Sequence, residues 1–218
     1  MTKRKITGTD QELTIGKLVC VGRNYAEHAK ELGNETPASP VLFMKPATAV
    51  IADGDYVRIP SFSSNCHHEV ELALLVGKRA AAVPPEDALQ YLAGYGVAID
   101  MTLRDVQDQL KSKGLPWDIA KGFDTSCPLS DFVSASSIVD PNNLALGLSV
   151  NGVPRQNGIT ADMIHSVEAI VSYISGIFTL EPGDVILTGT PAGVGQVQSG
   201  DVMEAEVTSV GSLKIFVQ

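Results

Sequence analysis

An apolar run that begins with two acids constrains the fold of this chain more than any other segment. Residues 69–76 read Glu-Val-Glu-Leu-Ala-Leu-Leu-Val, with the length and apolar content of a buried strand. Successive strand side chains point to opposite faces, so Glu69 and Glu71 share one face while the aliphatic residues at alternate positions share the other. The chain must therefore fold so that two carboxylates lie together against a core.

A third acid follows a second apolar run. Asp100 comes directly after Val-Ala-Ile at 97–99, so it is expected at the end of a second core element. Unpaired buried charges are very costly, and a divalent cation that prefers oxygen ligands neutralises them. Carboxylates without a cysteine cluster favour Mg²⁺, Mn²⁺ or Ca²⁺ over zinc or copper, and a site with open positions and retained waters suits Mg²⁺ or Mn²⁺ best. We therefore predict a metal site at Glu69, Glu71 and Asp100. The alternative is a solvated strand face, with Asp100 capping the following helix.

Composition indicates an ordinary globular protein and excludes some partners. The 218 residues are 44% hydrophobic and 19% charged, enough to bury a substantial core. The 16 basic and 25 acidic residues give a net charge of −9, which argues against nucleic acid or an anionic membrane as a main partner. No apolar run approaches the roughly 20 residues of a membrane span, and no apolar signal core follows the basic start, so a cytoplasmic location is expected.

The three cysteines, Cys20, Cys66 and Cys127, are widely spaced and form no C-x-x-C pair. This number and spacing argue against a disulfide framework. Each cysteine is expected in the core, and Cys66, beside two histidines, is the one candidate for a reactive thiol.

Short apolar runs separated by turns predict a chain rich in strands. Tight turns are expected at 182–184, at 199–201 and at Asn151-Gly152, which is the strongest hairpin signal. The strands are expected at residues 17–21, 41–44, 56–59, 70–76, 144–150, 185–187, 202–207 and 213–217.

Four helices are expected, at residues 25–32, 85–92, 102–113 and 160–178. The last is the longest, and apolar residues recur along it at helical spacing, which predicts a helix packed on the core. These residues are Met163, Val167, Ile170, Ile174 and Ile177.

Capping residues mark the ends of two of these helices. Asn24 could cap the first helix and Gly33 could end it. Thr102, with Asp105 three residues later, resembles a capping box, and Gly114 provides the stop.

Polar residues near Asp100 suit an organic acid as ligand. Arg104 and Gln107 lie three apart on one face of the helix that follows. Arginine offers a planar fork of donors and glutamine offers a donor and an acceptor, so the pair could hold a carboxylate beside the cation. The alternative is an exposed helix in which Arg104 pairs with Asp108. Lys121 follows the only tryptophan in an irregular connection, where a surface role is an equal alternative.

A histidine and a glutamate stand three residues apart on the short helix expected at 25–32. Glu31 could orient the His28 imidazole as a general base, although such pairs are also common on surfaces without a role. Glycines flank the helix at both ends, which fits a hinged lid better than a core helix. The glycine-rich loop at 188–195 has neither the lysine of a P-loop nor a G-x-G-x-x-G pattern, so nucleotide binding is not expected.

Six segments carry a combined signature that none of them carries alone. They are G-R-N-Y-A-E-H at 22–28, V-L-F-M-K-P at 41–46, H-H-E-V-E-L at 67–72, D-M-T-L-R-D-V-Q at 100–107, G-L-P-W at 114–117 and L-T-G-T-P-A-G-V-G at 187–195. Together they resemble the fumarylacetoacetate hydrolase family, in its branch of short acylpyruvases and oxaloacetate decarboxylases. The resemblance implies an α+β, β-rich fold, a mixed β-sandwich roll with a few peripheral helices. It also implies a single catalytic domain at 17–218 after an N-terminal extension at 1–16.

The same resemblance implies a homodimer that binds Mg²⁺ or Mn²⁺ through the three acids and takes a small 2-oxo acid as substrate. The implied catalytic residues are His28, Glu31 and Lys121, the first two on a closing lid. The residues implied around the substrate are Arg23, Lys45, Arg104, Gln107 and Thr190.

These residues fit one reaction scheme. A 2-oxo acid can chelate the cation through its carboxylate and 2-oxo oxygens. His28 would deprotonate a water that attacks the distal carbonyl, and carbon–carbon cleavage would release pyruvate enolate, stabilised by the metal and Lys121. We therefore expect a Mg-dependent hydrolase that cleaves a C–C bond in 2,4-dioxo acids of the acylpyruvate or fumarylpyruvate type, giving pyruvate and a carboxylic acid.

Membership of a fold does not show which of several reactions that use the same residues is catalysed. An oxaloacetate decarboxylase or oxaloacetate keto-enol tautomerase would form the same enolate, and an isomerase or decarboxylase of aromatic catabolism is a further alternative. A non-catalytic binding protein with a structural metal is the alternative of another class. The hinged pair of His28 and Glu31 argues against it, since a structural metal needs no general base.

Overall fold

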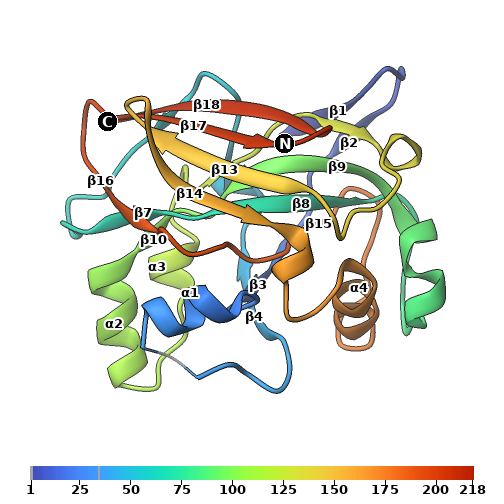
Figure 1. The fold of residues 1–218 in the computed structure, drawn as a ribbon, viewed down its shortest axis with the longest axis horizontal. Coiled ribbons are helices and arrows are strands. Elements are labelled where there is room, and N and C mark those ends of the chain that lie inside the picture. Colours follow the sequence, from blue (N-terminus) through green and yellow to red (C-terminus); the bar gives the residue numbers. More distant parts are fainter. Residues whose placement is uncertain (1, 34) are drawn as a thin grey trace.

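Two packed sheets form the body of the protein (Figure 1). The computed structural model describes residues 2–33 and 35–218. The larger sheet has eight strands, in the spatial order β2 (Glu12–Thr14), β1 (Lys3–Thr7), β12 (Phe132–Ser134), β9 (Leu92–Ile99), β8 (Val70–Val76), β15 (Val185–Leu187), β3 (Leu18–Gly22) and β4 (Val41–Lys45). The second sheet has five, in the order β14 (Val153–Ile159), β13 (Ala145–Val150), β17 (Val202–Val207), β18 (Gly211–Val217) and β6 (Tyr56–Val57).

Two small sheets and the helices complete the fold. One small sheet pairs β10 (Thr102–Leu103), β7 (Cys66–His68) and β16 (Gly195–Val197), and the other pairs β11 (Cys127–Pro128) with β5 (Val50–Ile51). The α-helices are α1 (Ala26–Glu31), α2 (Arg104–Ser112), α3 (Asp118–Lys121) and α4 (Val167–Ser175). The 3₁₀ helices are η1 (Ala47–Ala49), η2 (Pro85–Tyr91), η3 (Ala135–Ser137) and η4 (Thr160–Asp162).

The helices lie outside the sheets. In Figure 1, α1, α2 and α3 gather at one side of the molecule, below β7 and β10, and α4 lies at the other. Both parallel and antiparallel pairs occur in the larger sheet, β15 being parallel to β3 and β8 antiparallel to β9. The expected mixed, strand-rich α+β fold is thus confirmed. None of the helices in the described part of the chain is long and apolar enough to cross a membrane.

The strand β8 separates two cores, as the alternation in its sequence predicts. The aliphatic residues at its even positions, from Val70 to Val76, belong to the core that the two sheets enclose. Ala73 and Leu75 belong to a second core on the other face of the larger sheet. Glu71 shares the face of Ala73 and Leu75 because it lies two residues before Ala73. The acids therefore face away from the five-stranded sheet.

All eight expected strands are present, with ends that differ from the prediction by at most two residues. The hairpin at Asn151-Gly152 joins β13 to β14, and both turn residues have the positive φ, 52° and 75°, that such a turn requires. The strand β9 is longer than the apolar run at 97–99 from which a core element was predicted. Gly94 and Gly96 interrupt its hydrophobic pattern, and the ring of Phe132 lies only 2.9 Å from where a Cβ of Gly96 would be. These glycines therefore serve close packing inside the strand.

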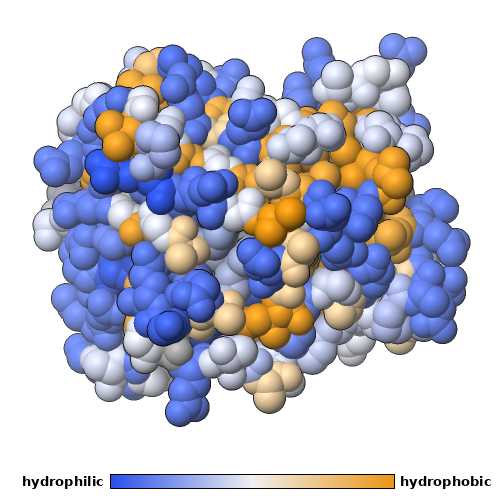
Figure 2. All heavy atoms as spheres, viewed as in Figure 1, coloured by the Kyte–Doolittle hydropathy of each residue, from blue (hydrophilic) through white to orange (hydrophobic). Residues whose placement is uncertain are grey.

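The surface facing the viewer in Figure 2 is hydrophilic over the side that carries α2 and α3. Hydrophobic residues gather in patches towards the middle and the upper right of the same view. The large apolar side chains that are exposed come from separate segments, among them Phe62, Leu115, Val153 and Ile177. Apolar residues scattered in this way are common on protein surfaces.

The prediction of one long helix at 160–178 is wrong, because the chain is not helical between η4 and α4. There the Ile164 N–H donates to the backbone oxygen of Asn24 at 2.8 Å, and the His165 N–H donates to Asn24 Oδ1 at 2.8 Å. Ser166 then starts α4, its hydroxyl accepting from the Ala169 N–H at 3.3 Å. Bonds to a distant residue thus take the donors that a continuous helix would use.

The apolar stripe of that segment is only partly buried. Val167, Ile170 and Ile174 are fully buried, as expected, and Met163 is half-buried. Ile177 is 54% exposed, because it lies beyond the end of α4. Its expected place in the core is therefore wrong.

Two expected caps are also wrong. Tyr25 is the N-cap of α1, and the side chain of Asn24 instead donates to the carbonyls of Thr188 and His165. Thr102 lies in β10, and α2 begins at Arg104 without a side-chain cap.

The acid of the expected capping box has a different task. The Asp105 carboxylate accepts from the Ser63 hydroxyl at 2.7 Å and from the Ser64 N–H at 2.9 Å, so it anchors the segment before β7. These bonds join residues far apart in sequence and leave no local pattern.

The three cysteines are buried and free, as expected. Burial raises the pKa of the Cys66 thiol to about 12. Since the thiolate is the reactive form, the burial of Cys66 and its raised pKa argue against a reactive thiol.

The segment expected as an N-terminal extension supplies two strands of the larger sheet. β1 pairs with β2 and, in parallel, with β12. The connection to β3 is fixed at the turn 182–184, where the Gly16 N–H donates to the carbonyl of Gly183 at 3.0 Å and the Lys17 N–H donates to Asp184 Oδ1 at 3.1 Å. Residues 3–14 are thereby packed against the rest of the fold.

Replacing Gly183 by alanine should destabilise the protein more than the same change at Gly54. Both residues have positive φ, 94° and 81°, but an added Cβ would lie 2.1 Å from the Thr14 carbonyl oxygen at Gly183 and would meet nothing within 4 Å at Gly54. We expect Gly54→Ala to lower the free energy of unfolding by about 1 kcal/mol and Gly183→Ala by at least about 2 kcal/mol. Urea unfolding measures both, and equal losses would contradict this close packing.

Candidate active site

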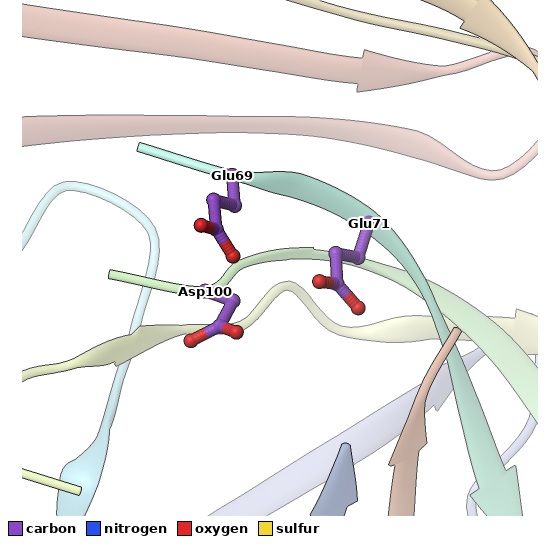
Figure 3. Close-up of side chains that lie close together, drawn as sticks. All are labelled: Glu69, Glu71 and Asp100. Atoms are coloured by element: carbon purple, nitrogen blue, oxygen red, sulfur yellow. The ribbon is translucent and has the colours of Figure 1, made fainter. Parts of the chain in front are cut away.

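Glu69, Glu71 and Asp100 converge at one end of the larger sheet (Figure 3). Glu69 precedes β8, Glu71 lies within it, and Asp100 follows the antiparallel neighbour β9, where its N–H donates to the Glu69 carbonyl at 2.7 Å. One oxygen from each carboxylate lies within 4.8 Å of the others. The three residues are 4%, 2% and 0% exposed, so the alternative of a solvated strand face is wrong. We call this group the acidic triad.

Three cations contact two of the carboxylates. Lys121 Nζ lies 2.7 Å from Glu69 Oε2 and 2.6 Å from Asp100 Oδ2. Arg104 Nη2 lies 2.5 Å from Glu69 Oε1, and Lys45 Nζ lies 2.7 Å from Asp100 Oδ1. All of these groups are buried, so in each ion pair the cation and the carboxylate supply the countercharge that the other needs.

Glu71 is the least compensated acid of the triad. Its Oε2 accepts from the Gly189 N–H at 2.6 Å, and it forms no ion pair among the residues that the structure describes. Burial and the negative charges of Asp100 and Glu69 raise the pKa of Glu71 well above its usual range. Burial opposes ionisation of Glu69 too, but its two cationic partners hold that pKa well below the usual range. A divalent cation would offset the charge of Glu71, and the all-oxygen donor set suits Mg²⁺ or Mn²⁺.

The acidic triad forms one wall of a pocket of about 430 Å³, counting the part open to solvent. A face of α2 forms the next wall, with Arg104, Gln107 and Lys111 at the spacing i, i+3, i+7. Arg104 Nη1 donates to Gln107 Oε1 at 2.7 Å, so Arg104 pairs with the triad and Gln107 and not with Asp108. The other lining residues are Val21, Gly22, Arg23, His28, Leu32, Phe43, Trp117, Lys121 and Thr190.

His28 and Glu31 bring α1 to this pocket. His28 Nδ1 lies 3.3 Å from Glu31 Oε2, and His28 is 5% exposed. Glu31 Oε1 accepts from the Gly193 N–H at 3.0 Å. Glu31 thus orients the imidazole and links α1 to the loop at 188–195. The movement of α1 as a lid stays a prediction.

Thr190 is held at the pocket by a glutamine that the sequence analysis missed. The Thr190 hydroxyl donates to the Val70 carbonyl at 2.7 Å and accepts from Gln156 Nε2 at 2.7 Å. Gln156 Oε1 accepts from the Val70 N–H at 3.0 Å and lies 2.9 Å from His68 Nδ1, which must be the donor. A glutamine within a strand gives no local sign that it will be buried, so no sequence signal pointed to it.

Lys45 lies behind the acidic triad and not in the pocket. Besides Asp100, its Nζ donates to the carbonyls of Met101 at 3.2 Å, of Ser126 at 3.0 Å and of Lys121. Its side chain is 0% exposed. In this position Lys45 holds Asp100 in place, and the substrate contact expected for Lys45 stays a prediction.

Two aromatic rings form an apolar part of the pocket. The ring centroids of Phe43 and Trp117 are 5.9 Å apart, and Lys121 Nζ lies 4.8 Å from the centroid of Phe43. A Cβ at Gly22 would come within 3.7 Å and 3.8 Å of the two rings. Gly22 therefore leaves the space between β3 and the rings open.

The fold and the acidic triad define a class of protein: a mixed β-sandwich with a buried carboxylate centre able to hold a divalent cation. Comparison with known families is more specific. Residues 17–218 match the family described as fumarylacetoacetate (FAA) hydrolase C-terminal. The chain belongs to the fumarylacetoacetate hydrolase family, which is a family of enzymes, and the resemblance seen in its motifs is confirmed.

Similar proteins are named for two activities. The human oxaloacetate tautomerase FAHD1, mitochondrial, is 50% identical over 201 residues, which cover 92% of this chain and 91% of the relative. The oxaloacetate tautomerase YcgM of Escherichia coli K12 is 53% identical over 188 residues, 86% of each chain. The crystal structure of fumarylpyruvate hydrolase from Pseudomonas aeruginosa, in complex with Mn²⁺ and pyruvate, matches with a TM-score of 0.94 and 40% identity, covering 99% of this chain and 95% of that one.

Substitutions within the acidic triad should separate cation binding from stability. Both Glu71→Gln and Asp100→Asn should weaken Mg²⁺ binding. Only Asp100→Asn should also lower the free energy of unfolding, by roughly 3–5 kcal/mol, because it leaves Lys45 and Lys121 short of countercharge. Calorimetric titration and urea unfolding of the metal-free protein measure the two effects. Glu206→Gln, at an exposed strand position, is the control, and unchanged Mg²⁺ affinity in both triad variants would refute the metal site.

Mg²⁺ binding should displace a proton from Glu71. The pKa of Glu71 is raised above the ordinary 4.5 in the metal-free protein, so proton and cation compete and the affinity should rise with pH through this range. The folded state holds this proton more tightly than the unfolded chain. The contribution of Glu71 to metal-free stability is therefore complete below 4.5 and is lost as pH rises through the raised pKa. Calorimetry in buffers of different ionisation enthalpy counts the proton, and an unchanged count in Glu71→Gln would contradict the assignment.

Proposed function

We propose that the protein is a divalent-cation-dependent enzyme of small 2-oxo acids, with keto–enol tautomerisation of oxaloacetate as its first candidate reaction. The observation that carries the proposal is the His28–Glu31 pair at a pocket that the acidic triad also lines. Two oxaloacetate tautomerases at 50% and 53% identity support it, as does the related structure with Mn²⁺ and pyruvate.

The substrate carboxylate would lie against α2. Arg104 Nε is buried and has no hydrogen-bond partner among the described residues, so a bound carboxylate would satisfy it. Gln107 and the Thr190 hydroxyl offer further polar contacts in the pocket. A cation held by the acidic triad would polarise the 2-oxo and carboxylate oxygens. The residues of the pocket then have only to orient the acid and exclude water.

Tautomerisation moves a proton between C3 and the 2-oxo oxygen. Glu31 engages Nδ1 of His28, which leaves Nε2 to take the proton from C3 and transfer it to the 2-oxo oxygen, giving the enol; the reverse transfers regenerate the keto form. Lys121 is held between Glu69 and Asp100, and its ammonium would stabilise negative charge on the 2-oxo oxygen. The step needs no water molecule as a reactant.

Hydrolytic cleavage of an acylpyruvate or fumarylpyruvate is the second candidate. The same His28 would instead deprotonate a water that attacks the distal carbonyl. The 40% identical fumarylpyruvate hydrolase structure supports this candidate, and oxaloacetate decarboxylation would need the same orientation of the acid without the base.

Other parts of the proposal depend on the sequence. The preference for Mg²⁺ over Mn²⁺, the homodimer and the catalytic domain at 17–218 stay predictions. A cytoplasmic location also stays a prediction, and the human relative is named as mitochondrial.

Replacing His28 should separate the reactions that need a base from the one that does not. His28→Ala should lower oxaloacetate tautomerisation and acylpyruvate hydrolysis by roughly 10²- to 10⁴-fold, because both require proton transfer, and oxaloacetate decarboxylation much less. Lys121→Ala should impair all three. Steady-state rates with Mg²⁺ and each substrate measure the effect.

Glu27→Ala is the matched control, since Glu27 is exposed on the same helix. An equal loss of all three reactions in His28→Ala would mean that His28 serves closure of the site and not proton transfer. If the wild-type protein turns over none of the three substrates with Mg²⁺ or Mn²⁺, the proposed function is wrong.

A further inference from the structure

We infer that the pocket selects 2-oxo acids with a second carboxylate, which Arg23 and Lys111 bind at the end remote from the acidic triad. The inference rests on the proposed function, because it requires the 2-oxo acid end of the substrate to lie at the triad. It adds a recognition role for two basic residues that the proton-transfer scheme does not use.

The two residues reach the pocket from different elements. Arg23 follows the end of β3, and Lys111 lies on the face of α2 that also carries Arg104 and Gln107. Arg104 contacts the triad, and Lys111 is seven residues further, about 10 Å along the helix axis. A substrate chelated at the triad would therefore extend along α2 towards these two side chains.

Neither basic group forms an ion pair in the described part of the chain. No ion pair or side-chain hydrogen bond of Arg23 or Lys111 occurs among residues 2–33 and 35–218, although both are half-buried. Burial lowers the pKa of the Lys111 ammonium, and the charge of Arg23 lowers it further, against the effect of Asp108. Two like charges are thus held near each other at the pocket, a costly arrangement that an anion would relieve.

The charge balance of the pocket also favours a dianion. The three negative charges of the triad are matched in number by three cations, Lys45, Arg104 and Lys121, which contact Glu69 and Asp100. A bound divalent cation and the pair of Arg23 and Lys111 would then leave the pocket strongly positive. A 2-oxo monocarboxylate offsets little of this charge, whereas a dicarboxylate places one negative charge at each end.

The backbone of Arg23 is strained. Its φ of 60° is in the left-handed region, which a non-glycine residue adopts at a cost of roughly 1–2 kcal/mol. Strain of this kind is concentrated at ligand sites. The neighbouring Asn24, 0% exposed, keeps this conformation in place through its bonds to Thr188 and His165.

Oxaloacetate and 2-oxobutyrate form a matched pair of ligands, since the second carboxylate of the first is a methyl group in the second. Calorimetric titration of the Mg²⁺-loaded protein should show tighter binding of oxaloacetate. Arg23→Gln and Lys111→Gln should each weaken oxaloacetate binding by roughly 10-fold or more and change 2-oxobutyrate binding by less than about 3-fold. Lys113→Gln, which removes an exposed charge beside the same helix, is the control and should change neither.

Oxalate distinguishes failure of this inference from failure of the proposed function, because oxalate can chelate the cation without reaching Arg23 or Lys111. If oxalate binds the wild-type protein but oxaloacetate is not preferred, or if the variants weaken both ligands equally, the inference is overturned and the proposed function stands. If neither oxalate nor oxaloacetate binds the Mg²⁺-loaded protein, the proposed function fails and the inference fails with it.

Discussion

The burial of three carboxylates at the ends of β8 and β9 determines the arrangement around them. Leaving such charges unpaired costs on the order of several kcal/mol each. The fold places a cationic side chain beside each carboxylate oxygen of Glu69 and Asp100. Lys45, Arg104 and Lys121 come from three different elements, β4, α2 and α3. The pairing therefore fixes how both helices dock on the larger sheet. It also leaves Glu71 as the one acid whose charge an added cation must offset.

One loop joins this centre to the helix that bears the candidate base. The Gly189 N–H bonds to Glu71, and the Gly193 N–H bonds to Glu31. Both glycines have positive φ, 96° and 98°, and a Cβ at either would lie 2.7 Å or 2.1 Å from atoms of neighbouring segments. Only glycine permits the backbone to approach so closely. The acid that lacks a cationic partner and the acid that orients His28 are thus held by the same short segment.

Local sequence patterns predicted those features of the fold that depend on residues close together in the sequence. Alternation along β8 was sufficient to place Glu69 and Glu71 on one buried face, and the turn residues at Asn151-Gly152 were sufficient for a hairpin. The features that the sequence did not predict share a different origin. Asn24 interrupts the expected helix at 160–178 through bonds across the fold, and carbonyls at 101–126 enclose Lys45; no window of sequence contains either set of partners. Lys111 was missed although its signal was local, at i+7 from Arg104.

The two ends of the pocket have separate roles in the choice of reaction. Tautomerisation, decarboxylation and hydrolysis all need the acidic triad, Arg104 and Lys121, so these residues cannot distinguish one substrate from another. The residues that differ in what they could contact are Arg23 and Lys111, which carry charge, and Phe43 and Trp117, which provide apolar surface. If the proposed function holds, a substrate is positioned correctly for His28 only when its remote group suits these side chains. Specificity would then depend on residues that take no part in proton transfer, and it could change while the acidic triad stays the same.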